Sequence, residues 1–169
     1  MRRFPTAVFA GLAAFVVALA CAASLPDNLY ELLFCRIPAW LAAAFFRADL
    51  DGASLTLGTG RVVAVTRACG GSDFFALVCA VLSWHAVRRK DAVALLLAGC
   101  GAWVFTVLVN GLRITVTIWA RAVAERFLPE RTWGSVHLAS GVLVFFPALM
   151  LLWWLCTRHG YCGQSETES

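Results

Sequence analysis

Long apolar segments are the feature that most constrains what this chain can fold into. Four of them stand out, at residues 4–25, 70–87, 92–109 and 136–156. Each approaches the ~20 residues that a helix needs to cross the ~30 Å hydrocarbon core of a bilayer. Of all residues 61% are hydrophobic and only 14% are charged, so lipid is the expected solvent for most of the surface. The pattern predicts an all-α integral membrane protein with about four transmembrane helices.

The length of 169 residues leaves room for a single membrane-embedded domain, residues 1–169. The first apolar segment has an alternative interpretation as a signal peptide, because Ala20-Cys21-Ala22 is similar to a cleavage site. The segment is longer than the ~7–15 residues of a signal-peptide core, which favours a retained anchor. The polar tail at 159–169 is expected to be disordered.

Dense basic flanks predict the orientation of the spans. Arg2-Arg3 precedes the first span and Arg88-Arg89-Lys90 follows the second, so both flanks are expected in the cytoplasm. The net charge of +4 comes from scattered arginines, without a cluster long enough to suggest nucleic-acid binding. Membrane lipid is therefore the expected partner, and nucleic acid is not.

The region between the first two spans has a different character. The apolar run 37–46 is bracketed by Arg36 and Arg47 and is too short to cross, so an interfacial or re-entrant helix is predicted. Two β-rich stretches, 54–57 and 61–67, flank a glycine-containing turn and predict a short hairpin. This hairpin is expected on the extracytoplasmic surface, because an open sheet edge cannot face lipid. Beyond residue 109, apolar positions recur on one helix face and predict an amphipathic continuation.

Cys69 has a setting that suits a nucleophile. It lies in Ala68-Cys69-Gly70-Gly71-Ser72, between the hairpin and the second span. Ser72 or Asp73 is a natural N-cap, so the thiol is expected near a helix N-terminus, where the helix dipole favours thiolate. Gly70 and Gly71 would let substrate backbone approach closely and could present amides to an oxyanion. The alternative is an ordinary cysteine in a loop before a helix.

Arg113 and His137 are the other two candidate catalytic residues. Under the predicted topology Cys69, Arg113 and His137 all lie at outer ends of spans, in one layer. His137 could act as a base, and Gly141 four residues later leaves room over its helix face. Arg113 could stabilise an oxyanion, and Asn110, on the same helix face, could orient it or bind substrate. An interfacial anchor and a snorkelling arginine are the alternatives.

In three short motifs the sequence resembles the exosortase/archaeosortase family. Ala68-Cys69-Gly70-Gly71 is similar to the cysteine motif of the family, Asn110-Gly111-Leu112-Arg113-Ile114 to its Asn-x-x-Arg-Ile pattern, and His137-Leu138-Ala139-Ser140-Gly141 to its His-x-x-x-Gly pattern. The three occur in family order over residues 68–141. The chain is most like the compact branch called exosortase K, and it lacks the additional spans of longer members.

This resemblance implies a Cys-His-Arg active site on the periplasmic face of the bacterial inner membrane. Substrates would be exported proteins with a C-terminal sorting signal: a short motif, a transmembrane helix and a basic end. It implies that Cys69 forms a thioester with the substrate, that His137 moves the proton and that Arg113 supports the oxyanion. An amine, a hydroxyl or water would accept the acyl group, and no cofactor is needed.

Two other functions remain open from the sequence. A non-catalytic membrane scaffold would need none of the three candidate residues. A membrane thiol oxidoreductase would need a resolving cysteine, for which Cys35 is the nearest outward-facing candidate. The cysteines form no CxxC pair and no zinc spacing with histidine, so no metal site is expected.

Overall fold

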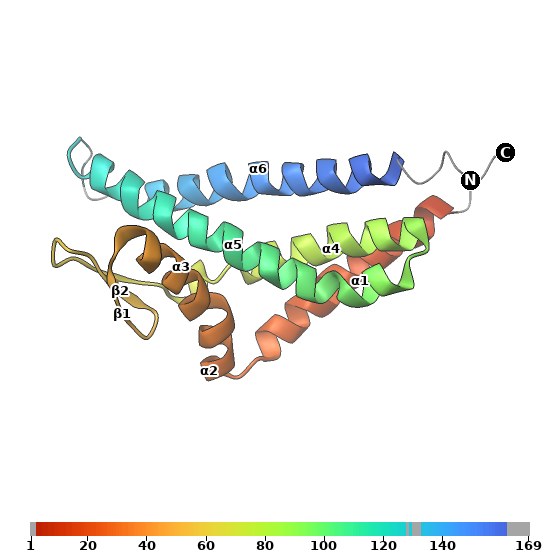
Figure 1. Ribbon diagram of the computed structural model, residues 1–169, viewed down its shortest axis with the longest axis horizontal. Helices are drawn as coiled ribbons and strands as arrows, with labels where there is room; N and C mark the ends of the chain where they lie inside the picture. The colour runs from red at the N-terminus through yellow and green to blue at the C-terminus, as the bar shows by residue number, and fades with distance from the viewer. Residues whose placement is uncertain (1–2, 128, 130–132, 162–169) are drawn as a thin grey trace. The chain divides into compact units, whose positions relative to one another are not determined.

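The computed structural model describes residues 3–127, 129 and 133–161 (Figure 1). Its long helices are α1 (Arg3–Ser24), α4 (Ser72–Arg89), α5 (Ala92–Ala124) and α6 (Trp133–Tyr161). Between α1 and α4 lie the short helices α2 (Asp27–Tyr30), η1 (Glu31–Arg36, a π-helix) and α3 (Ile37–Phe46), the strands β1 (Asp49–Asp51), β2 (Ser54–Thr56) and β3 (Val62–Ala64), and the 3₁₀ turn η2 (Arg67–Cys69).

Five helical stretches are long and apolar enough to cross a membrane by length and composition: Thr6–Ser24, Asp27–Phe46, Arg67–Arg89, Ala92–Ala124 and Gly134–Arg158. The prediction of an all-α membrane protein is confirmed. Two predicted spans end later than expected. The helix α5 continues through Asn110 and Gly111 to Ala124, and α6 continues to Tyr161. The remainder of the predicted tail, 162–169, lies outside the described residues.

The stretch Asp27–Phe46 is longer than the ten residues that the sequence suggested. The helices α2, η1 and α3 follow one another without a break, so Arg36 lies inside a helical run of 20 residues. The strands run beside it: α3 contacts β1 and β2, and Gly52 lies next to Glu31. By length and composition this run could cross a membrane, so the interfacial or re-entrant position stays a prediction.

The chain forms two compact units, which are described separately. The first contains residues 1–24, 72–105 and 147–169. In it α1 packs against α4, with Gly11 beside Ala80 and Trp84, and the two helices run antiparallel (Figure 1). Small residues at such positions let helix backbones approach closely. The guanidinium of Arg89 donates to the carbonyl of Cys156, so the C-terminal ends of α4 and α6 meet.

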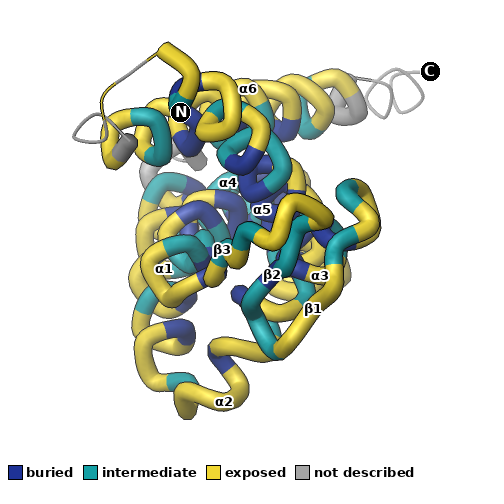
Figure 2. Tube along the Cα trace, turned by 90° about the vertical axis from the view of Figure 1, so that its left-hand side faces the viewer, coloured by how far each residue is buried: buried dark blue, intermediate teal, exposed yellow. Residues whose placement is uncertain are grey.

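The second unit contains residues 25–71 and 106–146. Its antiparallel sheet has the order β1-β2-β3, with Leu55 opposite both Leu50 and Val63. Leu55 is fully buried, as are Ala39 and Ala42 of α3, and Figure 2 shows buried positions alternating with exposed ones along the helices. The predicted hairpin is β2–β3. The third strand, β1, is absent from the prediction because its Asp-Leu-Asp sequence disfavours a strand.

Candidate functional site

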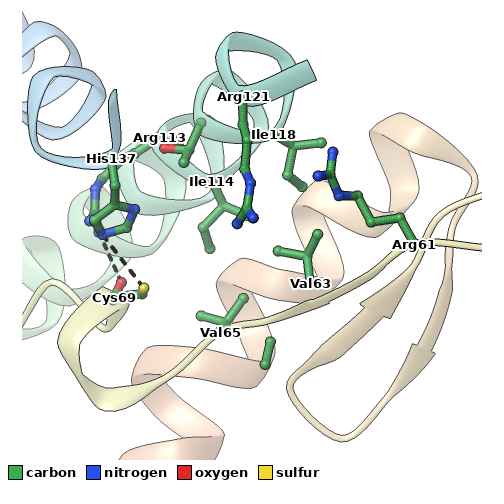
Figure 3. Close-up of a pocket in the computed structure, with 11 residues that line it drawn as sticks. Arg61, Val63, Val65, Cys69, Arg113, Ile114, Ile118, Arg121 and His137 are labelled. Atoms are coloured by element: carbon green, nitrogen blue, oxygen red, sulfur yellow. Dashed lines mark hydrogen bonds between the residues drawn. The ribbon is translucent and has the colours of Figure 1, made fainter. Parts of the chain in front are cut away.

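Three elements of the second unit bring Cys69, Arg113 and His137 together. Cys69 ends η2, Arg113 lies on α5 and His137 lies on the first turns of α6. The Sγ atom of Cys69 is 3.8 Å from Nε2 of His137, and Nη2 of Arg113 is 2.7 Å from the same nitrogen. Figure 3 shows the three side chains at one end of a cavity. Cys69 and His137 are half-buried, so both remain reachable from that cavity.

Arg113 is buried, with 6% of its surface exposed. Its Nη1 donates to the carbonyl oxygen of Cys69 at 3.1 Å and to Oδ1 of Asn110 at 3.3 Å, while its Nε has no hydrogen-bond partner. The Phe145 ring lies 5.2 Å from the guanidinium carbon. Within the described part of the chain no carboxylate pairs with it. A buried guanidinium without a carboxylate partner is costly, and it attracts any anion that forms beside it.

Asn110 fastens the cysteine turn to α5. Its side-chain nitrogen donates to the carbonyl oxygens of Cys69 at 2.8 Å and Gly70 at 3.1 Å, and its Oδ1 accepts from Arg113. The residue is 0% exposed. The orienting role expected for Asn110 fits this geometry. The other expectation, direct contact with substrate, does not, because the whole side chain is covered.

Packing and backbone conformation require glycine at positions 70 and 71. A Cβ on Gly70 would lie 2.6 Å from the hydroxyl of Tyr30, and the Gly70 amide already donates to the carbonyl of Arg67. Gly71 has φ +75°, and a Cβ there would meet the Asn110 side chain at 3.3 Å. The expectation that Gly70 offers its amide to substrate is therefore wrong. The requirement for both glycines comes from the protein itself.

Thr66 is a neighbour of the thiol that sequence reasoning missed. Its Oγ1 donates to Sγ of Cys69 at 3.8 Å, and its carbonyl accepts from Sγ of Cys35 at 3.6 Å. The signal available in the sequence is weak: a threonine three residues before the cysteine.

A pair of hydroxyls joins α5 to α6 next to the site. Oγ1 of Thr117 and Oγ of Ser140 are 2.6 Å apart. Thr117 also donates to the carbonyl of Arg113, and Ser140 to that of His137. Each catalytic candidate therefore lies one helical turn from a polar contact that fixes the spacing of the two helices. Gly141, on the same face of α6, has its Cβ position 3.3 Å from Nε of Arg113, which bears out the room predicted there.

The cavity beside these residues has a volume of about 130 Å³. It extends from Cys69 and His137 between β3 and α5 (Figure 3). Its surface is mainly apolar, although three arginines contribute to it, and its lining consists of Arg61, Val63, Ala64, Val65, Cys69, Arg113, Ile114, Thr117, Ile118, Arg121 and His137. A hydrophobic cavity that ends at a thiol and an imidazole is a suitable place for a small organic group beside the reacting atoms.

The other histidine that the structure describes with its side chain, His85, belongs to the first unit. Its ring contacts that of Trp153, with 4.9 Å between the centroids. The described cysteines are all free, and Cys21, Cys79, Cys100 and Cys156 belong to the first unit.

The fold and the site define a multi-pass membrane protein in which a thiol, an imidazole and a buried guanidinium converge. The chain belongs to the transmembrane exosortases: the family model described as "Transmembrane exosortase (Exosortase_EpsH)" matches residues 12–154. This confirms the resemblance inferred from the three motifs, and it supports a protease- or transpeptidase-like role in the membrane. No curated protein matches the chain, and no solved structure does.

Proposed function

We propose that the protein is a membrane-embedded cysteine protease-transpeptidase that cleaves the C-terminal sorting signal of exported proteins. The observation that carries the proposal is the contact of Nε2 of His137 with both Sγ of Cys69 and the guanidinium of Arg113. A nucleophile, a proton carrier and a cation without an anion are the groups that acyl transfer requires.

The proposed reaction has two halves. Sγ of Cys69 attacks the scissile carbonyl and forms a C–S bond, while His137 takes the thiol proton. The tetrahedral intermediate bears an oxyanion, which Arg113 stabilises. The C–N bond then breaks, His137 gives its proton to the leaving amine, and a thioester remains on Cys69. An amine, a hydroxyl or water releases the acyl group by the reverse sequence of proton transfers.

The substrate-free geometry adds a condition to this mechanism. A neutral imidazole has one acceptor nitrogen, and here Arg113 Nη2 donates to the same Nε2 that faces the thiol. While that hydrogen bond exists, Nε2 cannot take the proton of Cys69. We expect the substrate carbonyl to draw the guanidinium away, since its oxygen becomes negative during attack. Proton transfer would then follow substrate binding.

The proposed location is the bacterial inner membrane, with the site on the periplasmic side. In the first unit Arg89 joins the C-terminal ends of α4 and α6, and the antiparallel α1 begins at this same end. Basic residues gather there and predict a cytoplasmic position. Arg113 lies about 20 residues beyond the start of α5, and a helix of this length crosses about 30 Å.

Substitution of Cys69 tests the proposal. The strain would express Cys69→Ala together with a tagged protein that carries a C-terminal transmembrane helix and a basic end. We expect the uncleaved form to accumulate, and Arg113→Ala and His137→Ala to have the same effect. Cys79→Ala is the matched control, because Cys79 is a buried cysteine of α4. Normal processing in the Cys69→Ala strain would refute the enzyme and favour a scaffold.

The thiol oxidoreductase is kept as a second candidate because Cys35 and Cys69 both contact Thr66. It would require a disulfide between the two cysteines during turnover. Cys35→Ser separates the candidates: a protease keeps its processing activity, whereas an oxidoreductase loses its activity.

A further inference from the structure

We propose that the cavity between β3 and α5 is a substrate cleft in which an extended peptide segment adds to the free edge of β3, with one small apolar side chain between the strand and α5. This inference rests on the proposed function and specifies how its substrate is held. It concerns the chemistry of the segment beside the scissile bond, which the three catalytic candidates leave undefined.

The first argument is the unused edge of the sheet. β3 is the terminal strand of the order β1-β2-β3, and within the described residues no strand pairs with its outer edge. Leu57 donates to the carbonyl of Arg61, and Val65 donates to that of Ala53, on the β2 side. Because backbone groups alternate along a strand, the N–H and C=O groups of Val62 and Ala64 point to the outer edge. They offer two donors and two acceptors to an added strand.

The second argument is that this edge borders the cavity. Val63 and Val65 have their side chains on one face of the strand, and Ala64 has its side chain on the other. All three line the cavity, so the outer edge of the strand borders it together with the face that carries Val63 and Val65. Figure 3 shows Val63 and Val65 directed toward Ile114 and Ile118.

The third argument is the length of the cleft. Along α5 its lining runs from Arg113, next to Cys69, to Arg121. Eight residues of helix extend about 12 Å, and an extended peptide advances about 3.3 Å per residue. The cleft therefore matches three to four extended residues in length. At its far end Arg61 and Arg121 both pair with Glu125.

The aliphatic section between these ends selects the side chain. Its walls are Val63 and Val65 on the strand and Ile114 and Ile118 on α5. A valine-sized group fits a cavity of about 130 Å³ that it shares with peptide backbone. A lysine or arginine side chain would lose its hydration there without an anionic partner.

Filling the cavity tests the side-chain part of the proposal. We expect Val63→Phe to lower processing of the tagged protein at least about tenfold, since hydrophobic pockets discriminate by this amount. Val93→Phe is the matched control, because Val93 lies on α5, is 66% exposed and does not line the cavity. Alkylation of Cys69 by iodoacetamide should stay unchanged in both variants. Unchanged processing in Val63→Phe would overturn the proposal.

If Val63→Phe misfolds, it will also lose iodoacetamide labelling, and a second variant then tests the proposal. Val63→Ala enlarges the cavity, and we expect it to accept tagged proteins with a larger apolar residue near the cleavage site. An unaltered size preference in this variant would overturn the apolar subsite.

A synthetic probe tests strand addition without relying on processing. Acetyl-Val-Ala-Val chloromethyl ketone alkylates thiols, and three analogues would each carry one N-methylated amide. If the probe adds as a strand, methylation of the amides that face β3, either the middle one or the outer two, will slow Cys69 labelling, and methylation of the others will leave the rate unchanged. Equal effects at all three amides would refute strand addition. Because the readout is labelling, this result is distinguishable from failure of the Cys69→Ala test.

Discussion

At the scale of single residues, each polar group around Cys69 has a defined neighbour. Thr66 donates to the sulfur, Asn110 holds the carbonyl oxygens of the turn, and Arg113 bridges the turn to His137. Only Arg113 carries a charge, and its nearest partners are neutral or titratable. The arrangement leaves one strong electrostatic attraction available to substrate.

Gly70 provides a test of whether the turn is built for packing or for substrate. We expect Gly70→Ala to destabilise the protein by ~1–3 kcal/mol, the usual cost of overpacking, because the new methyl group would collide with Tyr30. Tyr30→Phe removes the closest atom and should restore part of both stability and processing. Thermal unfolding in detergent and cleavage of the tagged protein measure the two effects. Failure of Tyr30→Phe to rescue would mean that the glycine serves the substrate.

The three candidate catalytic residues could be predicted because each is a reactive or charged type at the end of an apolar run. The roles of Thr66 and Gly70 could not, since they depend on which atoms the folded turn brings within reach. For Asn110, the position on the same helix face as Arg113 could be predicted from helical spacing. Its hydrogen bond to the Cys69 carbonyl depends on tertiary structure and could not be predicted.

At the scale of elements, the site depends on the approach of α5 and α6. The Thr117–Ser140 hydroxyl contact fixes their spacing, and Gly141 lets Arg113 pass beside α6. Neither contact could be predicted from hydropathy, because hydropathy indicates which segments cross the membrane but not which helices pack together. The same limit applies to the run Asp27–Phe46, where the helix continues through Arg36 although this charge bounds the apolar stretch in the sequence.

Gly141 and Gly134 offer a matched comparison on α6. We expect Gly141→Ala to lower processing at least about tenfold, because its methyl group would displace the Arg113 guanidinium. No atom lies within 4 Å of a Cβ on Gly134. Gly134→Ala should keep full processing and gain ~0.5–1 kcal/mol from the better helix former. Equal processing by the two variants would contradict the proposed part of Arg113 in the reaction.

The hairpin is tied to the end of α5 by Glu125, which pairs with Arg61 and Arg121. The hydrogen bond from Arg61 lowers the pKa of Glu125, and Arg121 acts in the same direction. A lowered acid pKa stabilises the fold above the ordinary carboxyl range, and this contribution disappears as pH falls through the folded-state value.

We therefore expect the unfolding temperature of the protein in detergent to fall between about pH 6 and pH 3, and Glu125→Gln to remove part of this dependence. The effect should be small and weaken in salt, because the group is solvent-accessible. Asp49→Asn, on the exposed strand β1, is the control. Identical pH profiles for Glu125→Gln and the unmodified protein would show that the ion pairs do not hold the hairpin.

At the scale of the whole molecule, the proposed orientation predicts which cysteines a reagent outside the cell can label. Single-cysteine versions would retain only Cys69 or only an introduced Lys90→Cys. We expect a membrane-impermeant sulfonated maleimide to label Cys69 in intact spheroplasts, and Lys90→Cys only after the membrane is opened. Lys90 follows the end of α4 at Arg89, so the two positions report on opposite faces. Labelling of both, or the reverse order, would reject the orientation.

The polar pair on α5 also has a consequence for biogenesis. Asn110 and Arg113 lie within the candidate span Ala92–Ala124, and polar side chains on a lone inserted helix lack the protein partners that they have in the folded molecule. Their partners are the turn at Cys69, which the ribosome makes earlier, and His137, which it makes later. Until α6 emerges from the translocon, the guanidinium lacks its imidazole neighbour. Assembly of the site is therefore a late event in insertion, and a nascent chain that stops before α6 should be a target for membrane quality-control proteases.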